Sequence, residues 1–329
     1  MAFGLVTTMG TVSHTGAGGL VTGGGFGRLG RRFGLSVDNL RSVELVTADG
    51  EWVHADATQN PDLFWAVRGG GGNFGIVTNF EFELHPMQRE VVFGPLVFPI
   101  ERARDMLVMF SEYAPVAPDE LDMGFFVSHP KGENPRCGIG VCYSGPASEA
   151  EKALAPIRKV GTPTYDGVTS MDYVAVQRSG DIDDPRARAS YLKSGFISAM
   201  DGGLIDNILQ GLKDGPACDA AVFFQLSGGA INRVPSDATA FAYRDALGNL
   251  LSAVDWPAGE DPSEHIAWER AYWKTLEPST TGWYVNDQPL EGGKSVNANF
   301  RGNYDRLAQI KGRYDPDNLF RLNANITPA

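Results

Sequence analysis

Glycine alternates with hydroxyl residues over the run from Gly10 to Gly27, a combination that suits the binding of phosphate groups. Eleven glycines lie within residues 1–34. Successive backbone N–H groups in a glycine-rich loop can surround anionic oxygens, because glycine lets the main chain approach a ligand closely. Four hydroxyl side chains add neutral donors: Thr11, Ser13, Thr15 and Thr22. Because Val, Leu and Phe are interleaved with the glycines, the run predicts a pyrophosphate-binding loop rather than a flexible linker.

A literal Gly-x-Gly-x-x-Gly also lies in this region, from Gly25 to Gly30. In a dinucleotide-binding βαβ unit this pattern follows a strand and opens a helix. Here the preceding residues are rich in glycine, and the segment after the pattern is interrupted by Gly34. We therefore disfavour a Rossmann site. The glycine density predicts that residues 1–34 form a loop without helix or strand.

Cysteine and histidine give no sign of a metal site. The three cysteines, Cys137, Cys142 and Cys218, form no CxxC pair, and an odd number argues against a disulfide framework. We expect buried free thiols at Cys137 and Cys142, which lie in an apolar alternating run. The five histidines show no metal-binding spacing.

Charge and hydropathy limit the partners. The 28 basic and 40 acidic residues give a net charge of −12, which argues against nucleic acid and anionic membrane surfaces as partners. No apolar run reaches the roughly 18 residues of a membrane span. The start of the chain lacks the basic and apolar parts of a secretory signal. The chain as written is therefore expected in the cytoplasm, and its compartment stays open if the true N-terminus lies elsewhere.

Regular elements are expected to follow the loop. Two alternating β-branched runs flank Ala48-Asp49-Gly50 and predict a hairpin over residues 42–54. Asn60 as a cap and Pro61 at the first helical position predict a short helix. A second glycine cluster, Gly69–Gly72, leads into a strand over residues 74–84.

After Pro86, strands alternate with amphipathic helices, which predicts an α+β lobe with an antiparallel sheet and helices on one face. The expected strands span residues 91–98, 123–128, 138–143 and 221–226. The expected helices span residues 101–113, 148–160, 205–212 and 262–275. The tail is expected to form a helix from Asn303 to Asp315, with Leu307 and Ile310 inward, and then an extended strand over residues 321–328.

Several motifs together resemble the FAD-linked oxidases of the berberine bridge enzyme-like family. They are the run from Thr11 to Gly27, the segment Gly34-Leu-Ser-Val-Asp-Asn-Leu, the segment Asn60-Pro-Asp-Leu-Phe-Trp-Ala-Val-Arg with the glycines after it, and the tail from Asn303 to Pro328. The resemblance implies an α+β fold with a PCMH-type FAD-binding lobe and an antiparallel-sheet substrate lobe. The implied boundaries are 1–88 for a partial FAD lobe, 89–283 for the substrate lobe and 284–329 for a segment that returns to the FAD lobe.

The resemblance also implies which residues contact FAD. The pyrophosphate loop falls on Thr11, Ser13, Thr15, Gly16, Gly18 and Gly19. Phe26 corresponds to an aromatic residue near the cofactor, and Gly75 and Val77 to the strand that meets the adenosine end. Tyr284 and Asn286 match a Tyr-x-Asn that approaches the flavin.

Two departures bear on how FAD is held. The family's FAD lobe starts roughly a hundred residues earlier, with a histidine that bonds to the flavin, and nothing here matches that motif; His14 lies in the later loop. Val12 stands where bicovalent members have cysteine. We therefore expect a truncated FAD lobe with non-covalent or weakly held FAD. A complementary N-terminal segment or a second copy of the chain is then a candidate partner.

A third departure concerns the catalytic base. Many members read Tyr-x-Asn-Tyr and use the last Tyr, whereas this chain has Asp287 there. Asp287 is the candidate base if burial raises its pKa, with a solvated loop residue as the alternative and Tyr284 as the second candidate. Tyr191, Lys193 and Gln225 lie on expected strands of the type that face the flavin. Each alternates with apolar neighbours, so each points either to the substrate or to solvent.

The resemblance implies an FAD-dependent oxidoreductase of secondary metabolism that moves hydride from a substrate C–H to flavin N5. The expected substrate is a small molecule: an alcohol, a sugar or a natural-product intermediate. Dioxygen is the expected acceptor, giving hydrogen peroxide. Two alternatives stay open: a dehydrogenase with another acceptor, and a catalytically silent partial domain that does not hold FAD alone.

Overall fold

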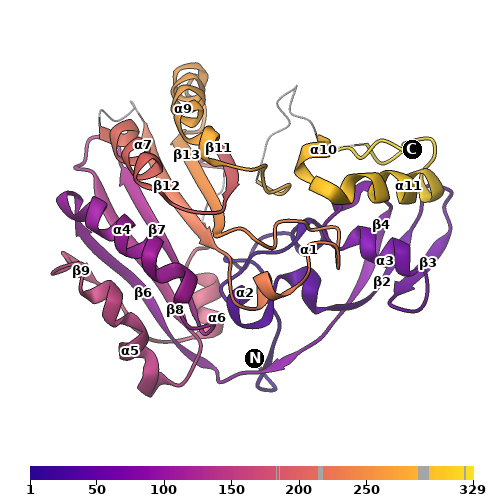
Figure 1. The fold of residues 1–329 in the computed structure, drawn as a ribbon, viewed down its shortest axis with the longest axis horizontal. Coiled ribbons are helices and arrows are strands. Elements are labelled where there is room, and N and C mark those ends of the chain that lie inside the picture. The colour runs from indigo at the N-terminus through magenta and orange to yellow at the C-terminus, as the bar shows by residue number, and fades with distance from the viewer. Residues whose placement is uncertain (183, 185, 214–217, 288–295, 322–323) are drawn as a thin grey trace. The chain divides into compact units, whose positions relative to one another are not determined.

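The computed structural model describes residues 1–182, 184, 186–213, 218–287, 296–321 and 324–329. They divide into two compact units, whose helices and strands are labelled in Figure 1. Unit 1 comprises Met1–Met87, Gly229–Asp245 and Tyr284–Ala329, and unit 2 comprises Gln88–Gly228 and Ala246–Trp283.

The stretch Gly229–Asp245 belongs to unit 1, although the sequence placed it in the substrate lobe. Buried contacts within unit 1 explain the difference. The Arg244 guanidinium donates to both carboxylate oxygens of Asp38, at 2.8 and 2.7 Å. The Trp65 indole N–H donates to the carbonyl of Asp237 at 2.7 Å. These partners are far apart in the sequence, so local patterns could not reveal the pairing.

Unit 1 is built on a three-stranded antiparallel sheet with the order β3-β2-β4. The strands of unit 1 are β1 (Leu5–Val6), β2 (Leu40–Val46), β3 (Trp52–Asp56), β4 (Ile76–Phe82) and β5 (His85–Pro86). Its helices are α1 (Ala17–Gly23), α2 (Gly30–Phe33), α3 (Pro61–Val67), α8 (Ala230–Arg233), α10 (Val296–Asn299) and α11 (Tyr304–Tyr314), with the 3-10 turns η1 (Ser36–Asn39), η2 (Gly71–Asn73) and η6 (Arg301–Asn303). The predicted hairpin is confirmed as β2 and β3, with Gly50 at a φ of +84° in the turn.

Three local predictions in unit 1 are wrong. Residues 1–34 hold α1, α2 and β1 rather than a plain loop. Asn60 has no capping bond; its side-chain amide donates instead to the His54 carbonyl at 2.8 Å. No strand is assigned to the described part of residues 321–328. The tail is held there by the Asn73 side chain, which donates to the Ala324 carbonyl and accepts from the Ile326 N–H.

Unit 2 contains a larger antiparallel sheet. Among the described residues its order is β10-β6-β8-β7-β12-β13-β11, with β9 also paired to β6. The strands are β6 (Glu90–Pro99), β7 (Leu121–His129), β8 (Arg136–Tyr143), β9 (Tyr165–Asp166), β10 (Thr169–Asp172), β11 (Arg188–Ile197), β12 (Asp219–Leu226) and β13 (Gly248–Pro257). The helices are α4 (Ala103–Tyr113), α5 (Ala147–Arg158), α6 (Tyr173–Arg178), α7 (Gly202–Lys213) and α9 (Ser263–Leu276), with the 3-10 turns η3 (Ile100–Arg102), η4 (Ala114–Val116) and η5 (Glu277–Ser279).

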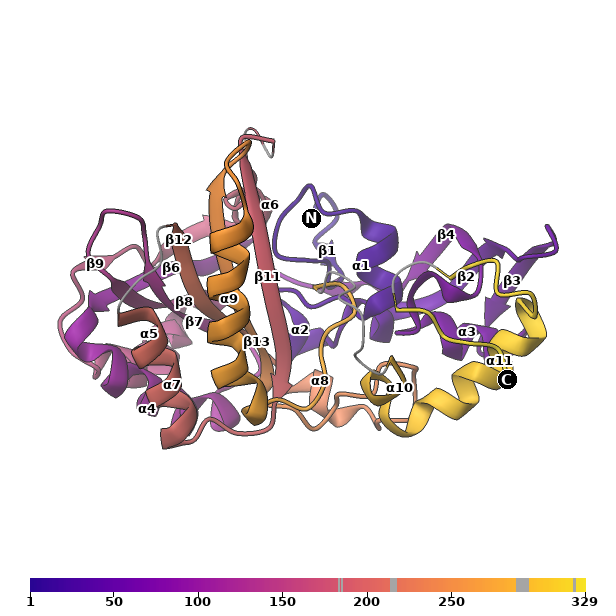
Figure 2. The same cartoon turned by 90° about the horizontal axis from the view of Figure 1, so that it is seen from above.

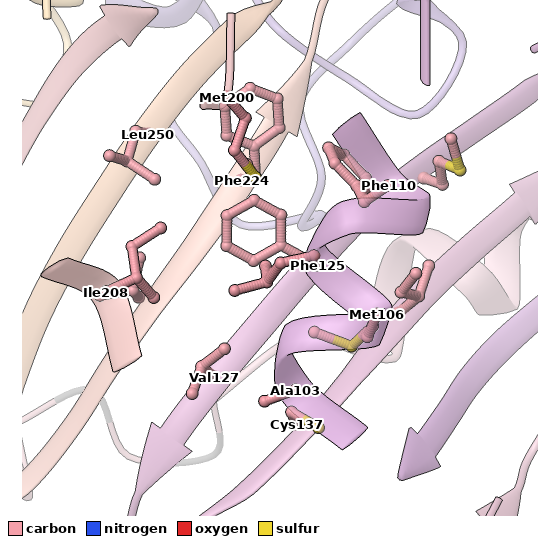
Figure 3. Close-up of a cluster of buried hydrophobic side chains, with 14 of the residues drawn as sticks. Ala103, Met106, Phe110, Phe125, Val127, Cys137, Met200, Ile208, Phe224 and Leu250 are labelled. Carbon is pink, nitrogen blue, oxygen red and sulfur yellow. The ribbon is translucent and has the colours of Figure 1, made fainter. Parts of the chain in front are cut away.

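The main core of unit 2 lies between this sheet and helices α4, α5, α7 and α9, which Figures 1 and 2 show along one face of the sheet. At its centre, Phe110 of α4 meets Phe125 of β7 edge-on, with ring centroids 5.1 Å apart. Phe125 stacks on Phe224 of β12 at 5.4 Å (Figure 3). The predicted α+β lobe, with an antiparallel sheet and helices on one face, is therefore confirmed.

Candidate functional site

The predicted pyrophosphate loop lies on the surface of unit 1, directly before and within α1. Thr11 is half-buried, whereas Ser13 and Thr15 are exposed. Gly16, Gly18 and Gly19 are exposed as well. The loop therefore presents bare backbone and hydroxyl groups to solvent, as a phosphate-binding loop must.

The glycines of this run fall into two classes. Gly16, Gly18 and Gly19 have no atom within 4 Å of the place where a β-carbon would stand, and none of them has a positive φ. Gly23, Gly24, Gly25 and Gly27, in contrast, would bring a β-carbon to 2.2–3.0 Å from other residues of unit 1. The later glycines are thus needed by the protein itself. Packing within unit 1 does not require glycine at Gly16, Gly18 or Gly19. Close approach of a ligand to the backbone would explain why these positions are glycine.

Two contacts correct or extend the donor set of the loop. The Thr22 hydroxyl donates to the Gly18 carbonyl at 2.9 Å and is nearly buried, so it serves α1 rather than a ligand. The Arg28 guanidinium donates to the Thr11 carbonyl at 3.3 Å and thereby brings a cation beside the loop. The signal for Arg28 in the sequence is its position as a basic residue directly after the glycine run that ends at Gly27.

Tyr284 and Asn286 lie against the C-terminal end of α1. The Tyr284 hydroxyl accepts from the Gly25 N–H at 2.8 Å and from the Asn286 amide at 2.8 Å. Burial, the largest cause, raises the pKa of Tyr284 well above its usual value. A phenol that accepts hydrogen bonds while its pKa is raised is a poor proton acceptor near neutral pH. Tyr284 is therefore disfavoured as the base.

Asp287 follows directly after this pair. It is half-buried, and its N–H donates to the Tyr284 carbonyl at 3.1 Å. Phe26 lies with its ring centroid 5.3 Å from that of Tyr284 and 6.0 Å from that of Phe241, both edge-on. Phe26 is thus part of a buried aromatic cluster in unit 1.

Gly75 directly precedes β4, and Val77 is the second residue of that strand. Gly75 has a φ of +153°, and a β-carbon there would lie 2.6 Å from the Val46 carbonyl oxygen of β2. Val77 is half-buried, pairs with Leu45 and packs on the core of unit 1. The sheet itself accounts for both residues, so the contacts in unit 1 give no independent support for their predicted role at the adenosine end.

In unit 2, Tyr191 and Lys193 lie on the opposite face of the sheet from Gln225. Tyr191 belongs to the core beneath the helices, and the Arg270 guanidinium of α9 donates to its hydroxyl at 3.3 Å. Lys193 is 5% exposed, with its ammonium 5.3 Å from the Tyr191 ring centroid. Tyr191 and Lys193 therefore do not share a face with Gln225, because side chains alternate between the two faces along a strand, and contact of these residues with a substrate stays a prediction.

Gln225 lies on the face of β12 that the helices leave uncovered, since its neighbours Phe224 and Leu226 point into the helix-covered core. It is half-buried and pairs across the strands with Asn249 of β13. The Asn249 amide donates to Gln225 Oε1 at 3.0 Å. Asn249 was missed by the sequence analysis because the pairing register of β12 and β13 is not visible in the sequence.

Lys193 lies near a buried polar cluster in unit 2. The Ser252 hydroxyl of β13 donates to Glu269 Oε2 of α9 at 3.0 Å, and Glu269 is fully buried. Burial raises the pKa of Glu269 to about 8, against the opposing effects of the Ser252 bond and the Lys193 charge.

No metal centre or membrane span emerges from the described part of the chain. Those residues contain no group of three or more His, Cys, Asp or Glu side chains placed to hold a metal ion. Cys137, Cys142 and Cys218 are buried and form no disulfide bond in the described part of the chain, and the burial of Cys137 and Cys142 was predicted. None of the described helices has the length and apolar character to cross a membrane.

Comparison with known proteins gives two family models. The model for "Berberine and berberine like" matches residues 283–327, and the model for an FAD binding domain matches residues 2–56. An FAD-linked oxidoreductase of Dictyostelium discoideum is 31% identical over 330 residues, which cover 99% of this chain and 71% of the relative. The (R)-6-hydroxynicotine oxidase of Paenarthrobacter nicotinovorans is 28% identical, with 99% and 73% covered.

Solved structures show the same fold. A BBE-like protein from Arabidopsis thaliana matches with a TM-score of 0.87 at 20% identity, covering 99% of this chain and 74% of that chain. A xylooligosaccharide oxidase from Myceliophthora thermophila, in complex with xylobiose, matches with a TM-score of 0.85 at 26% identity, covering 99% and 74%. These matches confirm the predicted α+β fold with a PCMH-type lobe.

Proposed function

The chain belongs to the FAD-linked oxidoreductases of the berberine bridge enzyme-like family, and from that premise we propose that it is an FAD-dependent oxidase of small molecules. The observation that carries the proposal is the open backbone at Gly16, Gly18 and Gly19. These residues fit the pyrophosphate of FAD, together with the hydroxyls of Thr11, Ser13 and Thr15 as neutral donors.

Bound FAD would supply the redox chemistry, as acceptor of the hydride from a substrate carbon and donor of two electrons to dioxygen, which with two protons would give hydrogen peroxide. The residues of the chain would supply orientation and a base. Asp287 is the proposed base, because the neighbouring Tyr284 hydroxyl is already an acceptor for Gly25 and Asn286. The Asp287 carboxylate would take the proton of a substrate hydroxyl while the adjacent carbon loses the hydride.

The proposed substrates are sugars, secondary alcohols and natural-product intermediates. Relatives include proteins named as a xylooligosaccharide oxidase and a hydroxynicotine oxidase, so both sugar and heterocyclic substrates belong in a screen. In unit 2, Gln225 supports a polar substrate, because the amide pair with Asn249 can hydrogen-bond a hydroxyl group. A complementary N-terminal segment or a second copy of the chain remains a proposed partner.

The first test is a visible spectrum of the purified protein after soaking with FAD and desalting. Flavin absorption that stays with the protein is expected, whereas a colourless protein would sink the proposal. Peroxide formation is then measured in air over a panel of sugars and alcohols. Flavin that is reduced by substrate but yields no peroxide would favour a dehydrogenase.

The base is tested with Asp287→Asn. The variant is expected to keep its flavin absorption and to lose about 10²–10⁴-fold in turnover, the usual contribution of a general base. Asp305→Asn is the matched control, since Asp305 is an exposed residue of α11. Equal turnover in both variants would remove Asp287 from the mechanism.

A further inference from the structure

Two side chains from the segment after residue 283 hold the end of helix α1. The Gly25 N–H donates to the Tyr284 hydroxyl at 2.8 Å, and the Asn286 amide donates to the Leu20 carbonyl at 3.2 Å. The Asn286 amide also donates to the Tyr284 hydroxyl at 2.8 Å, so the two side chains form one connected unit. Together they satisfy the Leu20 carbonyl, one of the groups that a helix end leaves without helical partners, and the N–H of Gly25, which lies two residues beyond the helix.

The main chain of this turn is shaped to receive the two side chains. A β-carbon at Gly23 would lie 2.3 Å from the Asn286 side chain, and one at Gly24 would lie 3.1 Å from the Tyr284 ring. Gly24 and Gly25 have φ values of +142° and +86°, which favour glycine. Tyr284 is 3% exposed, so its hydroxyl is shielded from water that could replace the bond with the Gly25 N–H, whereas the bond from Asn286 to Leu20 is exposed.

The same short helix carries the open glycines at its other end. Gly18 and Gly19 lie within α1, which ends at Gly23, and Gly16 precedes it. A shift of one end of a seven-residue helix moves the other end with it, because the helical hydrogen bonds make it a single body. The turn at Gly23–Gly25 thus sets where the open glycines stand.

We propose that Tyr284 and Asn286 are positioning residues, a latch that fixes the turn after α1 and thereby orients the predicted pyrophosphate loop. This inference rests on the proposed function, because the loop that the latch orients is the proposed FAD site. In this role Tyr284 acts by holding the backbone at Gly25, and proton transfer is carried out by another group.

The latch is tested in the full chain with Tyr284→Phe, which removes the hydroxyl but keeps the ring. Asn286→Asp is the second variant, because it keeps the shape and removes both amide donor bonds. Tyr314→Phe is the matched control: it removes another hydroxyl of unit 1, one that contacts Asp62 at 3.2 Å.

Hydrogen–deuterium exchange of the flavin-free protein gives the first readout. Amide exchange of the peptide covering residues 20–27 is expected to be at least tenfold faster in both latch variants and unchanged in Tyr314→Phe. FAD affinity, measured by quenching of flavin fluorescence, is expected to fall at least tenfold in the latch variants alone. The pH profile of the remaining turnover is expected to keep its wild-type shape in Tyr284→Phe.

Each of the following results would contradict one step of the proposal. Unchanged exchange at residues 20–27 would show that the latch does not hold the turn. Faster exchange with wild-type FAD affinity would show that the turn does not orient the loop. Lost turnover with unchanged FAD affinity would make Tyr284 a catalytic residue. A wild-type protein that binds no FAD would refute the proposed function, while the exchange measurement would still decide whether the latch exists.

Discussion

The ammonium group of Lys311 is fully buried in unit 1 and is surrounded by oxygen acceptors. It donates to the Asn73 carbonyl at 2.7 Å, to the Phe320 carbonyl at 2.8 Å and to the carboxylate of Asp315, which is also fully buried. Asp315 in turn accepts from the N–H groups of Leu319 and Phe320. One buried ion pair therefore connects α11 with the tail and with the second glycine cluster.

Lys311→Met is expected to destabilise the protein by about 3–5 kcal/mol, because it leaves the Asp315 carboxylate buried without its counter-charge. The double variant Lys311→Met/Asp315→Leu is expected to recover part of that loss. Urea unfolding at neutral pH measures both. Lys152→Met is the control, since the Lys152 side chain is 87% exposed. A loss no larger than that of the control would contradict the role given to this pair.

Glu269 makes the stability of unit 2 depend on pH. Burial raises its folded-state pKa to about 8 from the ordinary value of 4.5. The folded state then holds more protons than the unfolded state between these values. Its contribution to stability is present in full below pH 4.5 and is lost as the pH rises through about 8, by up to about 1.4 kcal/mol per pH unit.

Glu269→Gln removes this titration but keeps the size of the side chain. We expect the variant to gain stability relative to wild type as the pH rises from 6 to 9, as measured by urea unfolding at several pH values. Glu264→Gln, an exposed change on the same helix, is expected to follow wild type. Parallel pH curves for wild type and Glu269→Gln would rule out a titration of Glu269 in this range.

At the scale of elements, helix α1 carries two kinds of glycine that respond oppositely to alanine. Gly18 and Gly19 have open space around a β-carbon, and alanine favours a helix over glycine by about 1 kcal/mol per residue. Gly18→Ala and Gly19→Ala should therefore keep or raise the melting temperature of the flavin-free protein while weakening FAD binding. Gly23→Ala should lower the melting temperature, because the added methyl group would clash with the Asn286 side chain. If Gly18→Ala left FAD affinity unchanged, the glycine would have no part in the cofactor site.

The sequence predicted those elements whose pattern is local. The hairpin of β2 and β3 follows from its alternation and Gly50, and α4, α5, α7, α9 and α11 follow from their apolar spacing. Helix α1 was missed because glycine density outweighed the weak helical signal of a segment that is held at its end by Tyr284 and Asn286.

The side of the sheet that a residue faces was the harder problem. Lys193 pairs with Ser252, some sixty positions later in the chain, and only that register reveals the buried Glu269 across from both. A polar residue on a strand indicates solvent or a site when its distant partners are unknown, and only the register shows that Lys193 shares the helix-covered face with Tyr191 and Val254. The glycine loop, in contrast, could be predicted because its capacity to bind phosphate depends on consecutive residues of the backbone and not on distant partners.

At the scale of the whole molecule, the positions of the cysteines bear on whether FAD can be bound covalently through a thiol. Cys137, Cys142 and Cys218 all lie in unit 2, and all are buried. Burial raises the pKa of the Cys137 thiol to about 12 and that of Cys218 to about 11, so neither forms the reactive thiolate near neutral pH. In the glycine loop of unit 1 the residue that matches the family's cysteine is Val12. We therefore predict that no cysteinyl link to the flavin forms through this loop.

It follows that FAD bound to this chain should be released by denaturation. After acid precipitation of the loaded protein, we expect the flavin absorption in the supernatant and a colourless pellet. Protein that is denatured first and then mixed with free FAD controls for adsorption to the precipitate. Flavin that stays in the pellet after washing, beyond the amount adsorbed in the control, would mean that a residue other than cysteine forms the bond. The exposed His14, in the loop itself, would then be the first residue to replace, because it is a nucleophilic side chain that already lies beside the predicted pyrophosphate site.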